Sequence, residues 1–291
     1  MPRVRIKEVV DDSATQSEIK WAVSSRRLAS ESSDGTLTHI SASSLKLYLG
    51  CSLKYYFKKN LKLEEATSPA FQLGKAVHAG LQAFHVCRWR GESHDEQTVL
   101  EAYSRAFLEQ EQSDPVNYKT GERDKLLEKG ETMLKAYLDS DHAKMPDIPL
   151  GVEVKLEEEF AELPSPLLGY VDLVRTGRVP VDFKTCAATP NVELEAFQHE
   201  LQLTAYQLLI EAATGEAVEG RELVFLVKTK TPKVIVHRLP PATEADKARF
   251  WSIAQAAIDG ISRERFHPQP GMACSWCAFR QECAAWTGGK L

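Results

Sequence analysis

Gly169-Tyr-Val-Asp-Leu-Val-Arg-Thr-Gly-Arg-Val-Pro-Val-Asp-Phe-Lys-Thr185 is the stretch of sequence that decides the fold. Apolar and β-branched residues alternate on both sides of Arg175-Thr-Gly-Arg178, which predicts two strands joined by a tight hairpin turn. Asp172, Asp182 and Lys184 are separated by even numbers of residues, so we expect all three on the same face of the sheet.

Two facing carboxylates repel each other unless a cation lies between them. Mg²⁺ and Mn²⁺ prefer hard oxygen ligands of this kind, and a neighbouring amine could meet a scissile phosphate. The hairpin therefore predicts a metal-dependent nuclease. The alternative is that Asp172 and Lys184 are ordinary solvated residues of an exposed strand, because so short a pattern often arises by chance.

The composition is that of a globular protein. With 291 residues, 43% of them apolar, the chain can form one large domain or two small ones. No apolar run approaches the roughly 18 residues that span a bilayer, and the first residues lack the apolar stretch of a signal peptide, so we expect a cytoplasmic protein without a membrane partner. The formal net charge of −5 gives no general attraction to nucleic acid, so contacts with DNA would depend on local basic patches and on metal.

The period of the apolar pattern changes near residue 152. Helices are predicted over 41–56, 70–89, 96–112 and 122–138, followed by a strand from 152, the hairpin, a helix over 192–214, strands over 223–227 and 234–236, and a helix over 244–263. This order predicts an α/β (α+β) core, a mixed sheet flanked by helices, with a helical elaboration in front of it. A Walker-type phosphate-binding loop is absent from the sequence, so the chain does not resemble an ATP-driven motor.

We divide the chain into four parts on this pattern. Residues 1–36 form a disordered leader, 37–150 a helical part, 151–265 the nuclease core, and 266–291 a cysteine-rich segment. The last three parts are expected to form one integrated domain over 37–291.

Two side chains of the helix over 192–214 could complete a site around the hairpin. Gln202 and Tyr206 are four residues apart and therefore share a helix face, where an amide and a hydroxyl could hold a phosphate or position Lys184. The simpler explanation for each residue alone is that Tyr206 belongs to the core and Gln202 to the surface.

A histidine of the helix over 70–89 is a further candidate. His78 follows Gly74 by four residues, and a glycine one turn away allows close approach of a ligand or of another backbone. A lone histidine on an apolar helix face is more often a hydrogen-bonded core residue than a ligand, and His85 is a rival on the same stripe.

The ordered set of short motifs resembles a known nuclease family. Gly74-x3-His78, Gly169-x2-Asp172, Asp182-Phe-Lys184-Thr and Gln202-x3-Tyr206 are similar in order and context to the RecB/AddB-like branch of the PD-(D/E)XK nuclease superfamily, which includes CRISPR-associated RecB-like exonucleases. The resemblance runs from about Ser41 to Trp286, nearly all of the chain outside the leader.

The resemblance implies a PD-(D/E)XK restriction-endonuclease-like core and a role for each motif residue. Lys184 would be the catalytic amine, and Gln202 and Tyr206 would complete the site. The implied ligands of the metal are His78, Asp172, Asp182 and the backbone carbonyl of Phe183. The acid that many relatives carry in their first motif has no clear counterpart, and Glu153 and Glu157 are both candidates for it.

The chemistry of this ligand set is consistent with phosphodiester hydrolysis. A metal held by two aspartates and a histidine lowers the pKa of bound water and offsets charge that develops on the phosphate. Lys184 would then orient the water or stabilise the leaving charge. Imidazole is softer than carboxylate, so we expect Mn²⁺ to be accepted at least as well as Mg²⁺.

Cysteines give a second, independent signal. Cys274-Ser-Trp-Cys277-Ala-Phe-Arg-Gln-Glu-Cys283 places three thiols close together, which in a cytoplasmic chain favours metal ligation over disulfides. A fourth ligand is needed. Cys51 is the best candidate, because Cys186 is two residues past the catalytic lysine and Cys87 lies on a helix without ligand-like neighbours.

Cys51 and the C-terminal cysteine triplet also resemble the cluster cysteines of the same nucleases, which implies a structural [4Fe-4S] cluster. Zn²⁺ is the alternative occupant, because the spacing does not distinguish the two metals. Four lysines between Lys54 and Lys62 alternate with Tyr55-Tyr56-Phe57 after Cys51. They could form a DNA-facing patch of charges and stacking rings, or they could be the solvated face of a helix whose aromatic residues are buried.

We therefore expect a Mg²⁺- or Mn²⁺-dependent DNA exonuclease, a hydrolase acting on a single-stranded or free DNA end in recombination, repair or a related pathway, with a helicase, recombination or CRISPR-adaptation partner. The alternatives are a non-catalytic DNA-binding module and a zinc- or cluster-stabilised scaffold that docks on a helicase or an integration partner. The presence of Asp172, Asp182 and Lys184 together favours the enzyme, because a degenerate nuclease could lose any of them.

Overall fold

The computed structural model describes residues 38–114 and 116–288. The predicted leader over 1–36 lies outside the described residues.

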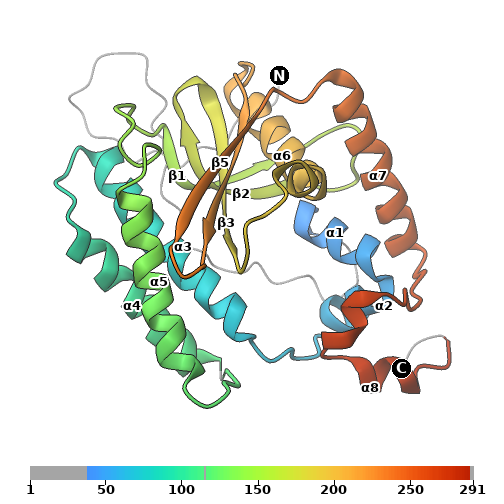
Figure 1. Ribbon diagram of the computed structural model, residues 1–291. Helices are drawn as coiled ribbons and strands as arrows, with labels where there is room; N and C mark the ends of the chain where they lie inside the picture. Colours follow the sequence, from blue (N-terminus) through green and yellow to red (C-terminus); the bar gives the residue numbers. More distant parts are fainter. Residues whose placement is uncertain (1–37, 115, 289–291) are drawn as a thin grey trace.

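A mixed sheet forms the centre of the molecule (Figure 1). Its five strands lie in the order of the sequence, and only β3 and β4 pair in parallel. The strands are β1 (Gly151–Glu158), β2 (Leu167–Arg175), β3 (Val179–Cys186), β4 (Arg221–Val227) and β5 (Lys233–Leu239). The predicted hairpin is confirmed, with a 3₁₀ turn over Thr176–Arg178 between β2 and β3.

Helices cover both faces of the sheet, as predicted for this fold class (Figure 1). One core joins the sheet to α3 (Pro69–Arg90), α4 (Glu96–Ser113) and α5 (Glu122–Leu138). The other core joins it to α1 (Ala42–Gly50), α6 (Val192–Thr214) and α7 (Glu244–Ser262). The helix α6 makes the crossover between the parallel strands β3 and β4.

The helix that the sequence predicts over 41–56 is broken at Cys51. This residue has an extended backbone (φ −165°, ψ 106°), so α1 ends at Gly50 and a separate α2 covers Ser52–Tyr55. A π-helical turn follows over Tyr56–Asn60. The other predicted helices and strands agree with the structure to within a few residues at each end.

The C-terminal segment packs against this broken helix. It contains a 3₁₀ helix over Met272–Trp276 and α8 (Arg280–Ala285). Phe279 joins Leu53, Tyr56 and Phe57 in a small separate core, and the Leu53 amide donates to the His267 carbonyl at 3.1 Å. Segments far apart in the sequence therefore meet at this end of the molecule (Figure 1).

A regular strand would place residues two apart on the same face, but β1 departs from this rule at Glu153. Val152 packs in the core with α3, α4 and α5, whereas Val154 packs in the core with α1, α6 and α7. The residue between them has a positive φ of 49°, which is rare for a residue with a side chain. As a result Glu153 is buried, whereas regular alternation with Val152 and Val154 would expose its side chain to solvent.

A buried ionic network surrounds Glu222 of β4, which is paired with Val181 of β3. Glu222 of β4 accepts hydrogen bonds from Arg175 and Arg238 and lies 3.1 Å from Nε2 of His142. Burial raises the pKa of Glu222, but His142 and Arg175 outweigh this effect and lower it to about 2.

Within the described part of the chain, no helix is both long enough and apolar enough to cross a membrane.

Candidate active site

The predicted site lies where β2 and β3 diverge. Their pairing begins at Arg175↔Val179 and ends at Leu173↔Val181, and Asp172 and Asp182 are the next residue on each strand. The Phe183 amide donates a 2.9 Å hydrogen bond to Oδ2 of Asp172, so a carboxylate takes the place of a strand partner. Both aspartates are buried, 7% and 2% exposed.

Lys184 lies beside the second aspartate, as the even spacing predicts. Its Nζ is 2.6 Å from Oδ2 of Asp182 and 3.4 Å from Oε1 of Gln202. Burial raises the pKa of Asp182, and the nearby Asp172 adds to the effect. Burial lowers the pKa of Lys184, but the two aspartates outweigh it and leave the pKa raised, so the amine is an ammonium at neutral pH.

The helix α6 brings an amide and a hydroxyl to the same place. Nε2 of Gln202 donates to Oδ1 of Asp182 at 3.1 Å and to the hydroxyl of Tyr206 at 2.7 Å. Gly169 of β2 allows this approach, because a Cβ there would be 2.6 Å from Cδ1 of Leu209 on α6. Tyr206 also lies in the core, so the packing explanation and the site explanation apply to it together.

The helix α3 reaches the site from the other face of the sheet. Nδ1 of His78 lies 3.4 Å from Oδ1 of Asp172. Burial lowers the pKa of His78, but Asp172 outweighs it and leaves the pKa raised. Gly74 lies one turn earlier, where an added Cβ would be 3.3 Å from Oγ1 of Thr185, so the glycine allows α3 to pack close to the end of β3.

His85, the rival candidate, is a core histidine. It is 1% exposed, its Nε2 is 2.7 Å from the Tyr137 hydroxyl, and its ring stacks on Phe183. It does not reach the two aspartates.

Glu153 joins the same cluster. One ligand atom each from His78, Glu153 and Asp172 lies within 4.8 Å of the others. The register of β1 and β2 places Glu153 opposite Asp172, and the glutamate is 5% exposed. Glu157, the other candidate, is exposed and lies 2.8 Å from Lys155.

The sequence left the choice between Glu153 and Glu157 open for a physical reason. The alternation with Val152 and Val154 predicts that the Glu153 side chain faces solvent. The positive φ at Glu153 changes this direction, and a backbone angle cannot be predicted from the pattern of apolar residues. The only available signal was an acidic residue on the strand before the hairpin.

These residues fit a hard divalent cation. His78, Glu153 and Asp172 bring one ligand atom each to within 4.8 Å of the others, and the buried Asp182 lies nearby on β3 but outside that group. Such a set suits Mg²⁺ or Mn²⁺. Without a cation the carboxylates would repel one another. Burial raises the pKa of Asp172, but His78 and Lys184 outweigh it and leave the pKa lowered, whereas the pKa of Asp182 stays raised.

The four cysteines of the predicted second site also meet. Cys51, Cys277 and Cys283 pack around the core formed by α2 and Phe279, and burial together with the other three thiols raises the pKa of Cys283. All four cysteines are among the described residues, and no three of their sulfurs lie within 4.8 Å of one another. Sulfurs around a tetrahedral zinc, with Zn–S bonds of about 2.3 Å, lie about 3.8 Å apart.

The proposed stacking rings of the basic patch are buried. Tyr55, Tyr56 and Phe57 are between 1% and 6% exposed, so the interpretation as DNA-stacking residues is wrong. Lys54 and Lys58 each contact Glu65 at 2.8 Å, which neutralises part of the charge.

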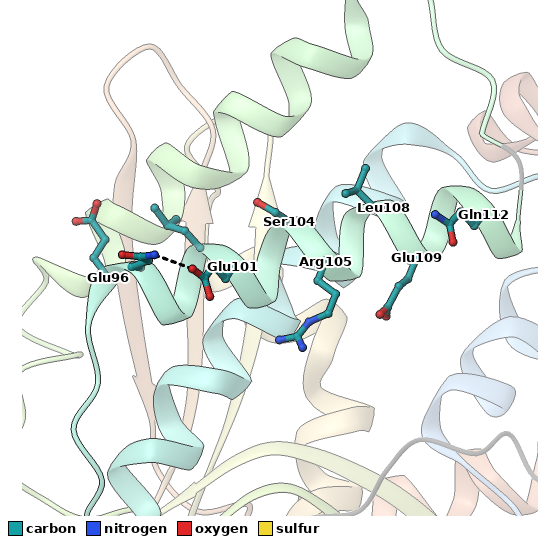
Figure 2. A pocket seen from close by; sticks show the side chains of 9 residues that line it. Glu96, Glu101, Ser104, Arg105, Leu108, Glu109 and Gln112 are labelled. Carbon is teal, nitrogen blue, oxygen red and sulfur yellow. Dashed lines mark hydrogen bonds between the residues drawn. The ribbon is translucent and has the colours of Figure 1, made fainter.

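A shallow hollow runs along the outer face of α4, between Glu96 and Gln112 (Figure 2). Its lining combines polar side chains with the apolar surface of Leu100 and Leu108, Gln97 donates to Glu101 at 2.7 Å, and none of the acidic site residues belongs to it.

Comparisons with known proteins agree with this fold. The family model described as PD-(D/E)XK nuclease superfamily matches residues 39–284. A crystal structure of a candidate exonuclease from Eubacterium rectale is similar over 87% of this chain and 90% of its own, with a TM-score of 0.59 and 15% sequence identity. At that identity the likeness concerns the fold alone.

Two other solved structures are more distant. The protein SSO0001 has a TM-score of 0.36 and 15% identity over 80% of this chain and 94% of its own. An alkaline exonuclease from Laribacter hongkongensis has a TM-score of 0.31 and 11% identity over 65% of this chain and 92% of its own. No curated protein matches the chain.

Proposed function

The chain belongs to the PD-(D/E)XK nuclease superfamily, and from this premise we propose that it is a RecB-like DNA exonuclease that hydrolyses phosphodiester bonds with Mg²⁺ or Mn²⁺. The observation that carries the proposal is the group of His78, Glu153 and Asp172, with the Asp182–Lys184 pair beside it, where β2 and β3 diverge. Buried like charges are unfavourable in a protein without a ligand for them, which supports a cation at this point.

His78, Glu153, Asp172 and Asp182 are the residues that would hold the cation, with the Phe183 carbonyl as the further ligand that the family resemblance implies. When bound, the metal would supply a more acidic water and offset the charge that develops on the phosphate. The oxygen and nitrogen donors of these residues suit the divalent cations that nucleases of this superfamily use.

The other site residues act through position and charge. The Lys184 ammonium can donate to the attacking water or to a phosphate oxygen, and its raised pKa keeps it charged while it does so. Gln202 contacts Asp182, Lys184 and Tyr206 at once, so it fixes the distance between the acid and the amine. The Tyr206 hydroxyl holds the amide of Gln202 in the orientation that this bridge requires.

Digestion of end-labelled single-stranded and duplex DNA with Mn²⁺ or Mg²⁺ tests the proposal. The parent protein should release nucleotides from linear DNA and leave closed circular DNA intact, and Lys184→Ala should lower the rate by at least about 100-fold. Lys155→Ala is the matched control, because Lys155 is exposed on β1 and paired with Glu157 of the same strand.

Three outcomes would contradict this assignment. If Lys184→Ala digests DNA as fast as the parent, the active-site assignment is wrong. Binding of DNA by the parent without cleavage under any divalent metal would favour the non-catalytic DNA-binding module. Activity with Mg²⁺ and none with Mn²⁺ would refute the expected metal preference.

We also propose that Cys51, Cys274, Cys277 and Cys283 hold a [4Fe-4S] cluster with a structural role. Support comes from the shared location of the four thiols and from the family resemblance of the cysteine pattern. Protein purified without oxygen should contain about four irons per chain and lose them in Cys283→Ser but not in the control Cys87→Ser. Zinc without iron in the parent would overturn this assignment.

A further inference from the structure

Lys46 of α1 lies beside the proposed active site. Its Nζ donates a 3.1 Å hydrogen bond to the backbone carbonyl of Gln198 on α6. Gln198 comes one helical turn before Gln202, about 6 Å along the helix axis. Gln202 is the residue that contacts both Asp182 and Lys184. The Lys46 ammonium therefore lies next to the catalytic amine, on an element that none of the nuclease motifs includes.

Among the described residues, this ammonium has no carboxylate in direct contact, although Asp182 and Glu195 lie near enough to act on its charge. Within 38–114 and 116–288, no carboxylate lies within 4.0 Å of Lys46 Nζ, and the Gln198 carbonyl accepts only one of its three N–H groups. By contrast, Lys54 contacts Glu65 at 2.8 Å and Lys247 contacts Glu211 at 2.9 Å. An unpaired ammonium beside another ammonium is a place where an anion would be stabilised.

The electrostatics of the two amines support their proximity. Burial lowers the pKa of Lys46, and Lys184 lowers it further, which outweighs the opposite effect of Asp182 and Glu195. The phosphate of a DNA strand would reverse this effect, because its negative charge would lie between the two ammonium groups.

His199 adds a neutral hydrogen-bonding group on the same side. It follows Gln198 directly and lies against Gln202; its Nδ1 is buried with no hydrogen-bond partner among the described residues by strict geometry, and its Nε2 lies 3.6 Å from Glu195. Burial, Lys184 and Lys46 lower the pKa of His199 to about 4, so the ring is uncharged at neutral pH. An uncharged imidazole can donate one N–H without adding to the repulsion between the lysines.

We propose that Lys46, with Lys184 and His199 beside it, forms a subsite for a second phosphate of the DNA strand, next to the scissile phosphate. This inference rests on the proposed nuclease function and extends it from the cleaved bond to the neighbouring nucleotide. Two phosphates held at once would fix the direction in which the strand lies across Asp172 and Asp182.

The test is equilibrium binding of a fluorescein-labelled single-stranded 20-mer in EDTA, where no cleavage occurs, at several salt concentrations. Lys46→Ala should weaken binding about tenfold, the equivalent of one charged hydrogen bond. It should also reduce the slope of log Kd against log salt by about 0.7, the value for one phosphate contact on a single strand. Lys46→Arg keeps the charge and should retain the parent slope.

Lys135→Ala is the matched control, because Lys135 is a lysine of α5 that pairs with Glu96 at 3.1 Å. Its slope and affinity should equal those of the parent. Comparison of 5′-phosphorylated with 5′-hydroxyl strands identifies the source of the phosphate. An equal loss for both places an internal diester at Lys46, and a loss confined to phosphorylated strands places the terminal phosphate there.

A purely structural role of Lys46 makes a different prediction. If its hydrogen bond to Gln198 only holds α1 against α6, Lys46→Ala lowers the melting temperature and leaves the salt slope unchanged. That result, in a parent that binds and cleaves DNA, overturns the subsite and leaves the nuclease proposal intact. A parent that neither binds nor cleaves DNA overturns both.

Discussion

Glu153→Gln should stabilise the protein in the absence of metal and weaken its response to metal. The substitution keeps the size of the side chain and removes one of the two carboxyl groups that meet between β1 and β2. The two ligand atoms lie at most 4.8 Å apart, so at an effective dielectric constant of about 20 the repulsion is about 3 kcal/mol. His78 compensates part of this repulsion, and we expect the free energy of unfolding in EDTA to rise by about 1–2 kcal/mol.

Thermal unfolding with and without Mn²⁺ measures both effects. A gain of 1 kcal/mol corresponds to about 2–4 °C in a domain of this size, so the melting temperature of Glu153→Gln in EDTA should exceed that of the parent by about 2–8 °C. Mn²⁺ should raise the melting temperature of the parent more than that of the variant, because the variant lacks one ligand and binds the ion more weakly.

Glu157→Gln on the same strand is the control. Glu157 is exposed and paired with Lys155, so its substitution should change neither quantity. The reasoning is refuted if Glu153→Gln is less stable than the parent in EDTA, or if its stabilisation by Mn²⁺ equals that of the parent.

Three other perturbations give separate predictions. Gln202→Ala should slow cleavage about 10- to 100-fold, because Gln202 positions Lys184. Mn²⁺ should still raise the melting temperature of this variant as much as that of the parent, since Gln202 holds no metal. Loss of this stabilisation by Mn²⁺ would contradict the assignment. Gly169→Ala should lower the free energy of unfolding in urea by about 1–3 kcal/mol, because its Cβ would lie 2.6 Å from Cδ1 of Leu209. The double variant Gly169→Ala/Leu209→Ala should lose less than the sum of the two single losses. Glu222 has a folded pKa of about 2 against an ordinary value of 4.5, so its charge stabilises the fold above pH 4.5 and this contribution is lost as the pH falls toward 2. The difference in unfolding free energy between the parent and Glu222→Gln should therefore shrink over that range, and a difference independent of pH would refute the proposed role of the charge.

Local pattern predicts most of the secondary structure of this chain. The helices over Glu122–Leu138 and Val192–Thr214 and the hairpin of β2 and β3 each follow from apolar periodicity and turn residues within the segment itself. The neighbourhood of Asp182, Lys184 and Gln202 was also accessible, because each residue stands at a fixed place on such an element.

The features that the sequence did not settle depend on contacts with distant segments. Tyr56 and Phe57 read equally well as exposed or buried until Phe279 of the C-terminal segment is seen to cover them. Glu153 reads as a solvated residue of an alternating strand, and only the positive φ at that position brings it to Asp172. Lys46 stands in no motif, and its proximity to Lys184 depends on how α1 packs against α6.

The meeting of Cys51 with the C-terminal cysteines has a consequence for how the protein is made. Cys274 leaves the ribosome more than 220 residues after Cys51, which at roughly 5–20 residues per second is a delay of about 10–45 s. During that time Leu53 and Phe57 have no Phe279 to cover them, and Cys51 is exposed to oxidants and to chaperones. Maturation of this end of the molecule is therefore a late event of biosynthesis, and a ribosome stalled before residue 274 would carry a nascent nuclease whose sheet is complete and whose closing contacts are missing.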